Sequence, residues 1–165
     1  MEKLTIGQAQ RLSAPSPFAL LGTKSAGGKE NFMAVSWWTY LSNHPPMLGV
    51  CLSDKGYSGA VIRETGEFTL CLVGESLREA ALRCGACSGR NTDKISMLGI
   101  ETVSCENVKA PAVKDSRLIF ECRLSDSCKA GDHTFYIAEI ISVRGDAEVA
   151  QLFAFDGYGR LDTVR

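Results

Sequence analysis

Residues 31–53, NFMAVSWWTYLSNHPPMLGVCLS, decide the fold. Two apolar runs in this stretch are separated by the pair Pro45-Pro46. Proline cannot donate a hydrogen bond to a strand ladder, so we expect one strand before the pair and a second strand over residues 47–52. The first run carries both tryptophans of the chain, Trp37 and Trp38, side by side. The stretch therefore predicts a β-rich fold with an aromatic wall in its first strand.

The rest of the chain continues the strand pattern. We expect further strands at residues 18–22, 67–73, 117–127 and 133–144, and a last strand within 153–164. A Gly131-Asp132 turn is typical of an antiparallel hairpin between the two long strands. Helical periodicity is confined to residues 58–65, which Gly66 closes, to 75–84 with Ser76 as N-cap, and to 93–98 with Thr92 as N-cap. No repeat or linker divides the chain, so we expect a single mainly β (α+β) domain over residues 1–165, an antiparallel β-barrel with short inserted helices.

The composition is that of a globular protein. Of the 165 residues 45% are hydrophobic and 22% charged, and the net charge is −1. Without a block of like charges, nothing indicates a nucleic-acid or membrane partner. The N-terminal segment MEKLTIGQAQ lacks the apolar core of a signal peptide, which favours a cytoplasmic location.

The seven cysteines are odd in number and irregular in spacing, unlike a disulfide framework. The pair Cys84-Gly-Ala-Cys87 has the CxxC spacing of a redox dithiol or half a zinc site. However, the chain has no second CxxC pair for zinc, and this motif closes the expected helix instead of opening one. We therefore expect no metal site and interpret the two residues as incidental thiols at a helix end.

Five motifs, in order and in register, resemble the flavin reductase-like FMN-binding proteins, which include the flavoredoxins. They are NFMAVSWWT, HPPMLGVCLS, YSGAVIRETGEFTLCL, CGACSGRNTDK and GDHTFYIAEI, and the resemblance covers about residues 13 to 160. It implies a split β-barrel that forms a homodimer and holds FMN non-covalently near the dimer interface.

The residues of the first strand have the chemistry that such a cofactor needs. A flavin requires apolar walls for its ring and hydrogen-bonding groups for its polar edge. Asn31, Ser36 and Thr39 can supply the polar contacts, and Trp37 or Trp38 the aromatic wall. Strict alternation places Ser36 and Thr39 on opposite faces, so both reach one ligand only across a bulge or twist. Without the resemblance, ordinary strand and core positions would explain these residues.

A turn that opens the first expected helix predicts a phosphate site. Ser53, Lys55 and Ser58 lie where backbone N–H groups and the helix dipole favour an anion. The family usually has an arginine directly before its Tyr-Ser or Tyr-Thr pair, but here that position is Gly56. Arg90 or Lys94 can supply part of the missing charge.

The resemblance also implies roles for a loop and a histidine. The loop with Ser88, Arg90 and Lys94 corresponds to the family loop that lies over the flavin, and a solvated surface loop is the alternative. His133, at the hairpin turn, corresponds to the position that faces the flavin and serves nicotinamide binding and hydride transfer in the reductases. His44 is assigned no role.

The expected function is that of an FMN-binding oxidoreductase. Two versions stay open: flavoredoxin-like electron transfer to a redox protein, and flavin reduction by NAD(P)H. No GxGxxG fingerprint is present, so any NAD(P)H would bind over the flavin and not on a Rossmann domain. The alternative is a non-enzymatic split-barrel module for haem binding or flavin sensing, for which His133 or a cysteine would be the axial ligand.

Overall fold

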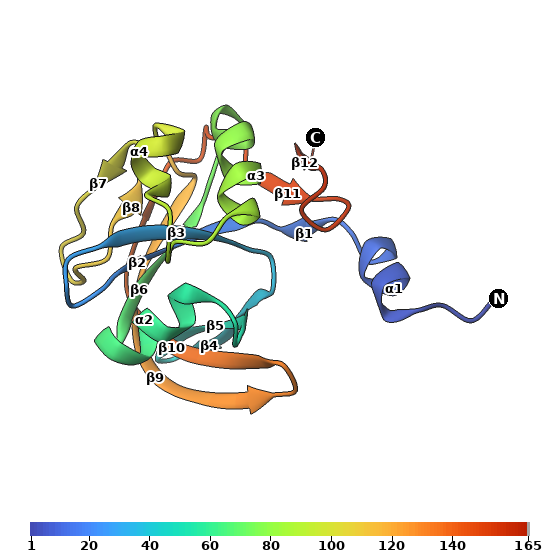
Figure 1. The fold of residues 1–165 in the computed structure, drawn as a ribbon, viewed down its shortest axis with the longest axis horizontal. Helices are drawn as coiled ribbons and strands as arrows, with labels where there is room; N and C mark the ends of the chain where they lie inside the picture. Colours follow the sequence, from blue (N-terminus) through green and yellow to red (C-terminus); the bar gives the residue numbers. More distant parts are fainter. Residues whose placement is uncertain (165) are drawn as a thin grey trace.

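The computed structural model describes residues 1–164, and its centre is one seven-stranded antiparallel sheet (Figure 1). The strands run in the order β3 (Glu30–Val35), β2 (Ala19–Lys24), β6 (Glu67–Leu72), β9 (Leu118–Ala130), β10 (His133–Gly145), β5 (Pro46–Ser53) and β4 (Trp38–Asn43). The expected antiparallel, mainly β fold with short helices is confirmed.

The two edge strands explain how the sheet closes on itself. β3 and β4 are consecutive in the chain but lie at opposite edges of the sheet. Only Ser36 and Trp37 connect them, and a connection of this length spans at most about 11 Å. The sheet must therefore curl until its edges approach each other, which produces a barrel that is split between β3 and β4. Instead of the single expected strand, the chain forms two strands with Ser36 and Trp37 at the break.

Both faces of the sheet are covered, which is why its central strands are apolar on both sides. In β2, Leu20 packs into one core and Leu21 into the other. Helices α3 (Arg78–Ala86) and α4 (Lys94–Leu98) lie on one side of β3, and α2 (Tyr57–Thr65) lies on the other (Figure 1). Phe32 belongs to the core beneath α3, whereas Ile62 of α2 belongs to the second core. β3 thus separates two helical segments that face each other across it.

The helix ends differ in part from the expected ones. Gly66 closes α2 in a left-handed conformation with φ of 72°, as expected. Ser76 does not cap the next helix, because the chain first forms the 3-10 turn η1 (Glu75–Leu77), in which the Leu77 amide donates to the Gly74 carbonyl. The N-cap of α4 is Asp93 and not Thr92, because the Asp93 carboxylate accepts the Ser96 amide at 3.1 Å.

The long hairpin forms as expected. Gly131 takes φ of 63° at its turn, and His133 is the first residue of β10. In the register of the sheet, His133 lies opposite Ser53 at the end of β5. The hairpin thereby brings the histidine to the strand end where the predicted phosphate turn begins.

Both termini carry elements that the pattern did not indicate. Helix α1 (Ile6–Leu12) begins with a capping box of Thr5 and Gln8, buries no residue and extends away from the body (Figure 1). The tail forms two short strands and not one. The small strands of the fold are β1 (Ser16–Pro17), β7 (Thr102–Val103), β8 (Ala112–Val113), β11 (Leu152–Ala154) and β12 (Leu161–Thr163). None of the helices described is long and apolar enough to cross a membrane.

Candidate functional site

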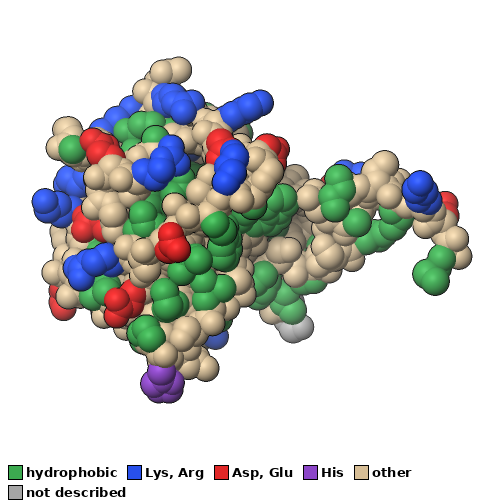
Figure 2. Space-filling view, turned by 90° about the horizontal axis from the view of Figure 1, so that it is seen from below, with side chains coloured by type: hydrophobic (Ala, Val, Ile, Leu, Met, Phe, Trp, Pro, Cys, Tyr) green, Lys and Arg blue, Asp and Glu red, His purple; other side chains and the backbone are tan. Residues whose placement is uncertain are grey.

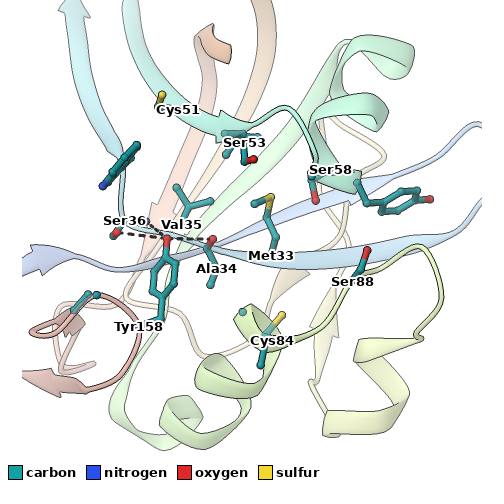
Figure 3. Close-up of a pocket in the computed structure, with 18 of the residues that line it drawn as sticks. Met33, Ala34, Val35, Ser36, Cys51, Ser53, Ser58, Cys84, Ser88 and Tyr158 are labelled. Carbon is teal, nitrogen blue, oxygen red and sulfur yellow. Dashed lines mark hydrogen bonds between the residues drawn. The ribbon is translucent and has the colours of Figure 1, made fainter. Parts of the chain in front are cut away.

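A cavity of about 590 Å³ lies over the C-terminal half of β3. Its walls come from β3, the β3–β4 break, the end of β5, the start of α2 and the end of α3 with the loop that follows. Ser58 lies on one side of β3, and Cys84 and Ser88 lie on the other, with Met33 between them (Figure 3). The two helical segments that β3 separates therefore meet around this cavity.

The structure brings most of the predicted site residues together, although they come from four separate segments. Those that line the cavity are Asn31, Ser36, Trp37, Ser53, Lys55, Ser58, Ser88, Lys94 and His133. Trp38, Thr39 and Arg90 do not line it. Trp38 donates from Nε1 to the Pro17 carbonyl at 3.2 Å and packs against Phe120, and the Thr39 side chain is exposed on β4. Strict alternation places Ser36 and Thr39 on opposite faces of one strand. The break between β3 and β4 separates the two residues, so that Ser36 lines the cavity and Thr39 is exposed on β4.

One end of the cavity has the features of an anion site. Gly56 is the N-cap of α2 and supplies no side-chain acceptor, so the first amides of the helix are not capped from within the chain. These amides and the helix dipole favour an anionic group. The Lys55 side chain is exposed at this end.

A second lysine, which the sequence did not indicate, stands beside the same end. Lys29 donates from Nζ to the Arg90 carbonyl at 3.1 Å, and its Nζ lies 5.6 Å from the centroid of the Tyr57 ring. Tyr57 is the first residue of α2 and lines the cavity. Lys29 sits in a glycine-rich turn between two strands, which is why it looked like an ordinary surface residue.

The carboxamide of Asn31 has one partner and one free acceptor. Its Nδ2 donates to Ser58 Oγ at 3.0 Å, whereas the buried Oδ1 accepts no hydrogen bond. Asn31 is only 2% exposed and lines the cavity. A buried acceptor without a partner costs about 1–3 kcal/mol, so this oxygen fits a ligand that brings an N–H or O–H donor.

The loop after α3 approaches Asn31 so closely that only glycine fits. A Cβ on Gly89 would collide with the Asn31 carboxamide and would lie 3.0 Å from Tyr57 Cδ1. The backbone of the loop thus forms the cavity wall at this point. A flavin ring needs such flat backbone and apolar surfaces, and the residues present fit one.

Lys94 is buried beneath the cavity wall. It is 3% exposed, and its Nζ donates to the Phe32 carbonyl at 3.0 Å and to the Cys84 carbonyl at 2.7 Å. These bonds fix the end of α3 to β3. The ammonium group therefore holds the cavity wall together and places a positive charge directly behind it.

The two cysteines of the CxxC pair differ in environment. Cys84 donates from Sγ to the Phe32 carbonyl at 3.1 Å, and burial raises the pKa of its thiol to about 11. Cys87 is half-buried, and its Sγ donates to the Arg83 carbonyl at 3.5 Å. Both line the cavity, which the sequence did not predict, but neither forms a disulfide. No group of three or more His, Cys, Asp or Glu side chains that could hold a metal occurs within residues 1–164.

Beside Ser53, at the end of β5, an indole and an imidazole of the cavity lie together. The centroids of Trp37 and His133 are 4.9 Å apart, and the ring planes are inclined by 36°. His133 Nδ1 lies 2.7 Å from Asp132 Oδ1, and this hydrogen bond holds the pKa of Asp132 below its usual value. A carboxylate partner at Nδ1 fixes the orientation of the ring and leaves Nε2 for a ligand.

Tyr158 is a wall residue that sequence reasoning missed. Its hydroxyl accepts the Ser36 amide at 3.1 Å (Figure 3). Its ring packs edge-on against Phe18, with centroids 5.9 Å apart. The sequence placed it within a terminal strand, where nothing marks a link to Ser36, 122 residues earlier. The flanking glycines of FDGYGRL were the available signal.

Comparisons with known proteins agree with this geometry. The flavin reductase like domain family matches residues 11–162. Flavoredoxin of Desulfovibrio vulgaris (Miyazaki F) superposes with a TM-score of 0.87 at 28% identity, over 99% of this chain and 94% of that one.

Among curated relatives, an uncharacterised protein of Archaeoglobus fulgidus is 33% identical over 120 residues, which cover 72% of this chain and 68% of that protein. The NADH:riboflavin 5'-phosphate oxidoreductase of Streptomyces pristinaespiralis is 24% identical over 131 residues, or 78% of this chain and 70% of that one. The chain belongs to the flavin reductase-like domain family, and it is a flavin-binding oxidoreductase with a split-barrel fold.

Proposed function

We propose that the flavin is FMN and that it binds in the cavity over β3. The observation that carries this proposal is the combination of an uncapped helix start at Gly56 with the unpartnered Asn31 Oδ1 in one cavity. The helix start receives the phosphate, and Asn31 Oδ1 accepts a hydrogen bond from the ligand. FMN carries a single phosphate, which matches a cavity with one such anion site.

The charges near the anion site complete this assignment. Lys55 lies in the turn before α2, and Lys29 lies beside Tyr57. Together they supply the positive charge of the arginine that the family usually has at the position of Gly56. Ser53 and Ser58 contribute hydroxyl groups, although Ser58 is 1% exposed and already accepts from Asn31.

The remaining wall residues position the ring. A bound flavin supplies hydride and electron transfer, and the protein supplies orientation and electrostatics. Trp37 covers one face at the end where His133 offers a hydrogen-bonding nitrogen. Lys94 places a buried positive charge behind the wall, which favours negative charge on a ligand.

For the reaction, we propose that the FMN is reduced by NAD(P)H or by a redox protein at the Trp37–His133 end. The name of the Streptomyces relative supports a nicotinamide donor, and that of the Desulfovibrio neighbour supports a protein carrier. His133 then binds or orients the donor, and the protein acts in the cytoplasm.

We also propose a homodimer. Ile6 and Leu12 of α1 are 76% and 73% exposed, and Leu41 of β4 is also exposed. Hydrophobic side chains lie uncovered along the projecting N-terminal segment that carries α1 (Figure 2). A second copy of the chain would bury such surfaces in a dimer interface. Light scattering at micromolar concentration, with FMN bound, is expected to give the dimer mass, and a monomer mass would contradict the proposal.

A titration with three flavins tests the cofactor assignment. Flavin-free protein is titrated with FMN, riboflavin and FAD, and binding is followed by flavin fluorescence. We expect FMN to bind more tightly than either of the others. Riboflavin binding equal to FMN binding would show that the helix start does not receive the phosphate.

A further inference from the structure

The hydroxyl of Tyr158 occupies a position where two donors of the cavity wall converge. It accepts the Ser36 amide at 3.1 Å and the Ser36 hydroxyl at 3.4 Å, and it lies 3.5 Å from the Ala34 carbonyl, to which it donates (Figure 3). Ser36, Ala34 and Tyr158 all line the cavity. The phenol oxygen therefore stands where the wall is arranged to bind an acceptor atom.

The ring of the side chain that fills this position is partly exposed. Tyr158 is 43% exposed, and its ring has one aromatic neighbour, the edge of Phe18. It lies between Gly157, whose φ is 53°, and Gly159. The Gly159 amide donates to the Asp156 carbonyl at 2.8 Å and closes the turn, so the backbone can stay in place while the ring rotates outward.

The acceptor that replaces the phenol should be a neutral oxygen of carbonyl type. A carbonyl oxygen has two lone pairs and can accept from both Ser36 donors, as the phenol oxygen does. The polar edge of an isoalloxazine ring carries such oxygens, and the adjacent Trp37 provides a flat apolar surface for the ring. The phosphate is excluded from this position, because its site lies at the opposite end of the cavity at the start of α2.

We propose that Tyr158 is a gate residue that competes with the ring edge of the flavin for the two donors of Ser36. This inference rests on the proposed binding of FMN in the cavity. While the cavity is free, Tyr158 keeps the Ser36 donors paired; when the flavin enters, a ring carbonyl takes them and the tyrosine rotates away. The affinity of the flavin is lowered by the fraction of molecules in which Tyr158 occupies the position.

The substitution Tyr158→Phe separates this role from a structural one. Phenylalanine keeps the ring contact with Phe18 but removes the oxygen that competes for Ser36. A gate predicts that flavin binding becomes tighter, by about threefold to tenfold, the change in an equilibrium constant that corresponds to a typical net hydrogen bond. A tyrosine that only supports the wall predicts weaker binding. The sign of the change therefore decides between the two roles.

The experiment is a fluorescence titration of flavin-free wild type and Tyr158→Phe with FMN and with lumiflavin, which has the ring system without ribityl phosphate. The gate predicts tighter binding of both ligands to the variant by the same factor, together with an equal or lower melting temperature of the flavin-free protein. Tyr40→Phe is the matched control, because Tyr40 is exposed and does not line the cavity. It should leave both dissociation constants within about twofold of wild type, the change expected at a surface position.

Unchanged or weaker FMN binding to Tyr158→Phe would overturn the gate while leaving the FMN assignment intact. A gain for FMN without a gain for lumiflavin would also overturn it, because the competing atom would not belong to the ring. Failure of wild-type protein to bind FMN would instead overturn the proposed function, from which the gate follows.

Discussion

Trp37 and His133 lie with their ring centroids 4.9 Å apart at one end of the cavity, although 96 positions separate them in the sequence. Trp37 stands at the break between β3 and β4, and His133 begins β10. Their pairing places an aromatic face and a hydrogen-bonding nitrogen together at the cavity, beside Ser53 at the end of β5.

His133→Ala should slow flavin reduction by NAD(P)H or by a reduced protein partner about tenfold to a hundredfold, because it removes the group that positions the donor. Stopped-flow absorbance measures the rate on samples with full FMN occupancy. The matched control is His44→Ala, since His44 is exposed and does not line the cavity. Equal rates of flavin reduction in the two variants would show that His133 takes no part in the reaction.

The double substitution Lys55→Ala and Ser58→Ala should weaken FMN binding by at least about tenfold and riboflavin binding less, because it removes the charge and the hydroxyl that the proposal assigns to the phosphate. Lys114→Ala serves as the charge control, because Lys114 pairs with Glu101 away from the cavity. Ser58 Oγ also accepts a hydrogen bond from Asn31, so part of the loss should be common to both flavins. An equal loss for both flavins would place the phosphate elsewhere.

Gly89→Ala should reduce FMN affinity about tenfold or more, because the new methyl group forces the loop away from Asn31, and overpacking costs about 1–3 kcal/mol. Gly27→Ala is the control, since a Cβ there meets its nearest neighbour, Ser25 Oγ, at an ordinary 3.8 Å. Titration calorimetry measures both. Normal FMN binding by Gly89→Ala would show that the loop backbone is not part of the flavin wall.

Cys87→Ser should keep flavin reduction within a few-fold of wild type, or about 1 kcal/mol in the barrier. Burial raises the pKa of the Cys84 thiol to about 11, so its reactive thiolate is scarce near neutral pH and the pair cannot cycle readily as a dithiol. The comparison uses the same stopped-flow assay as His133→Ala. A larger loss of reduction rate in Cys87→Ser than in His133→Ala would indicate that flavin reduction proceeds through sulfur chemistry.

Alternation and turn glycines, which are local signals, predicted β2, β5, β6, β9, β10 and the long hairpin. The resemblance to the family indicated nine of the residues that line the cavity. The sequence could not predict Tyr158 or Lys29, whose relation to the cavity depends on contacts between distant segments. Nor could it predict the position of Trp38, because the break at Ser36 and Trp37 reverses which side chains reach the cavity. The capping errors at Ser76 and Thr92 have a local cause: backbone bonds and Asp93 satisfy the amides instead.

The absorbance spectrum of the purified protein, with release and identification of any bound chromophore, tests the central claim most directly. We expect flavin bands, about one flavin per chain after loading with FMN, and release of FMN and not FAD. A Soret band would indicate a haem-binding module instead. A spectrum without flavin bands that stays unchanged on addition of FMN would contradict the account.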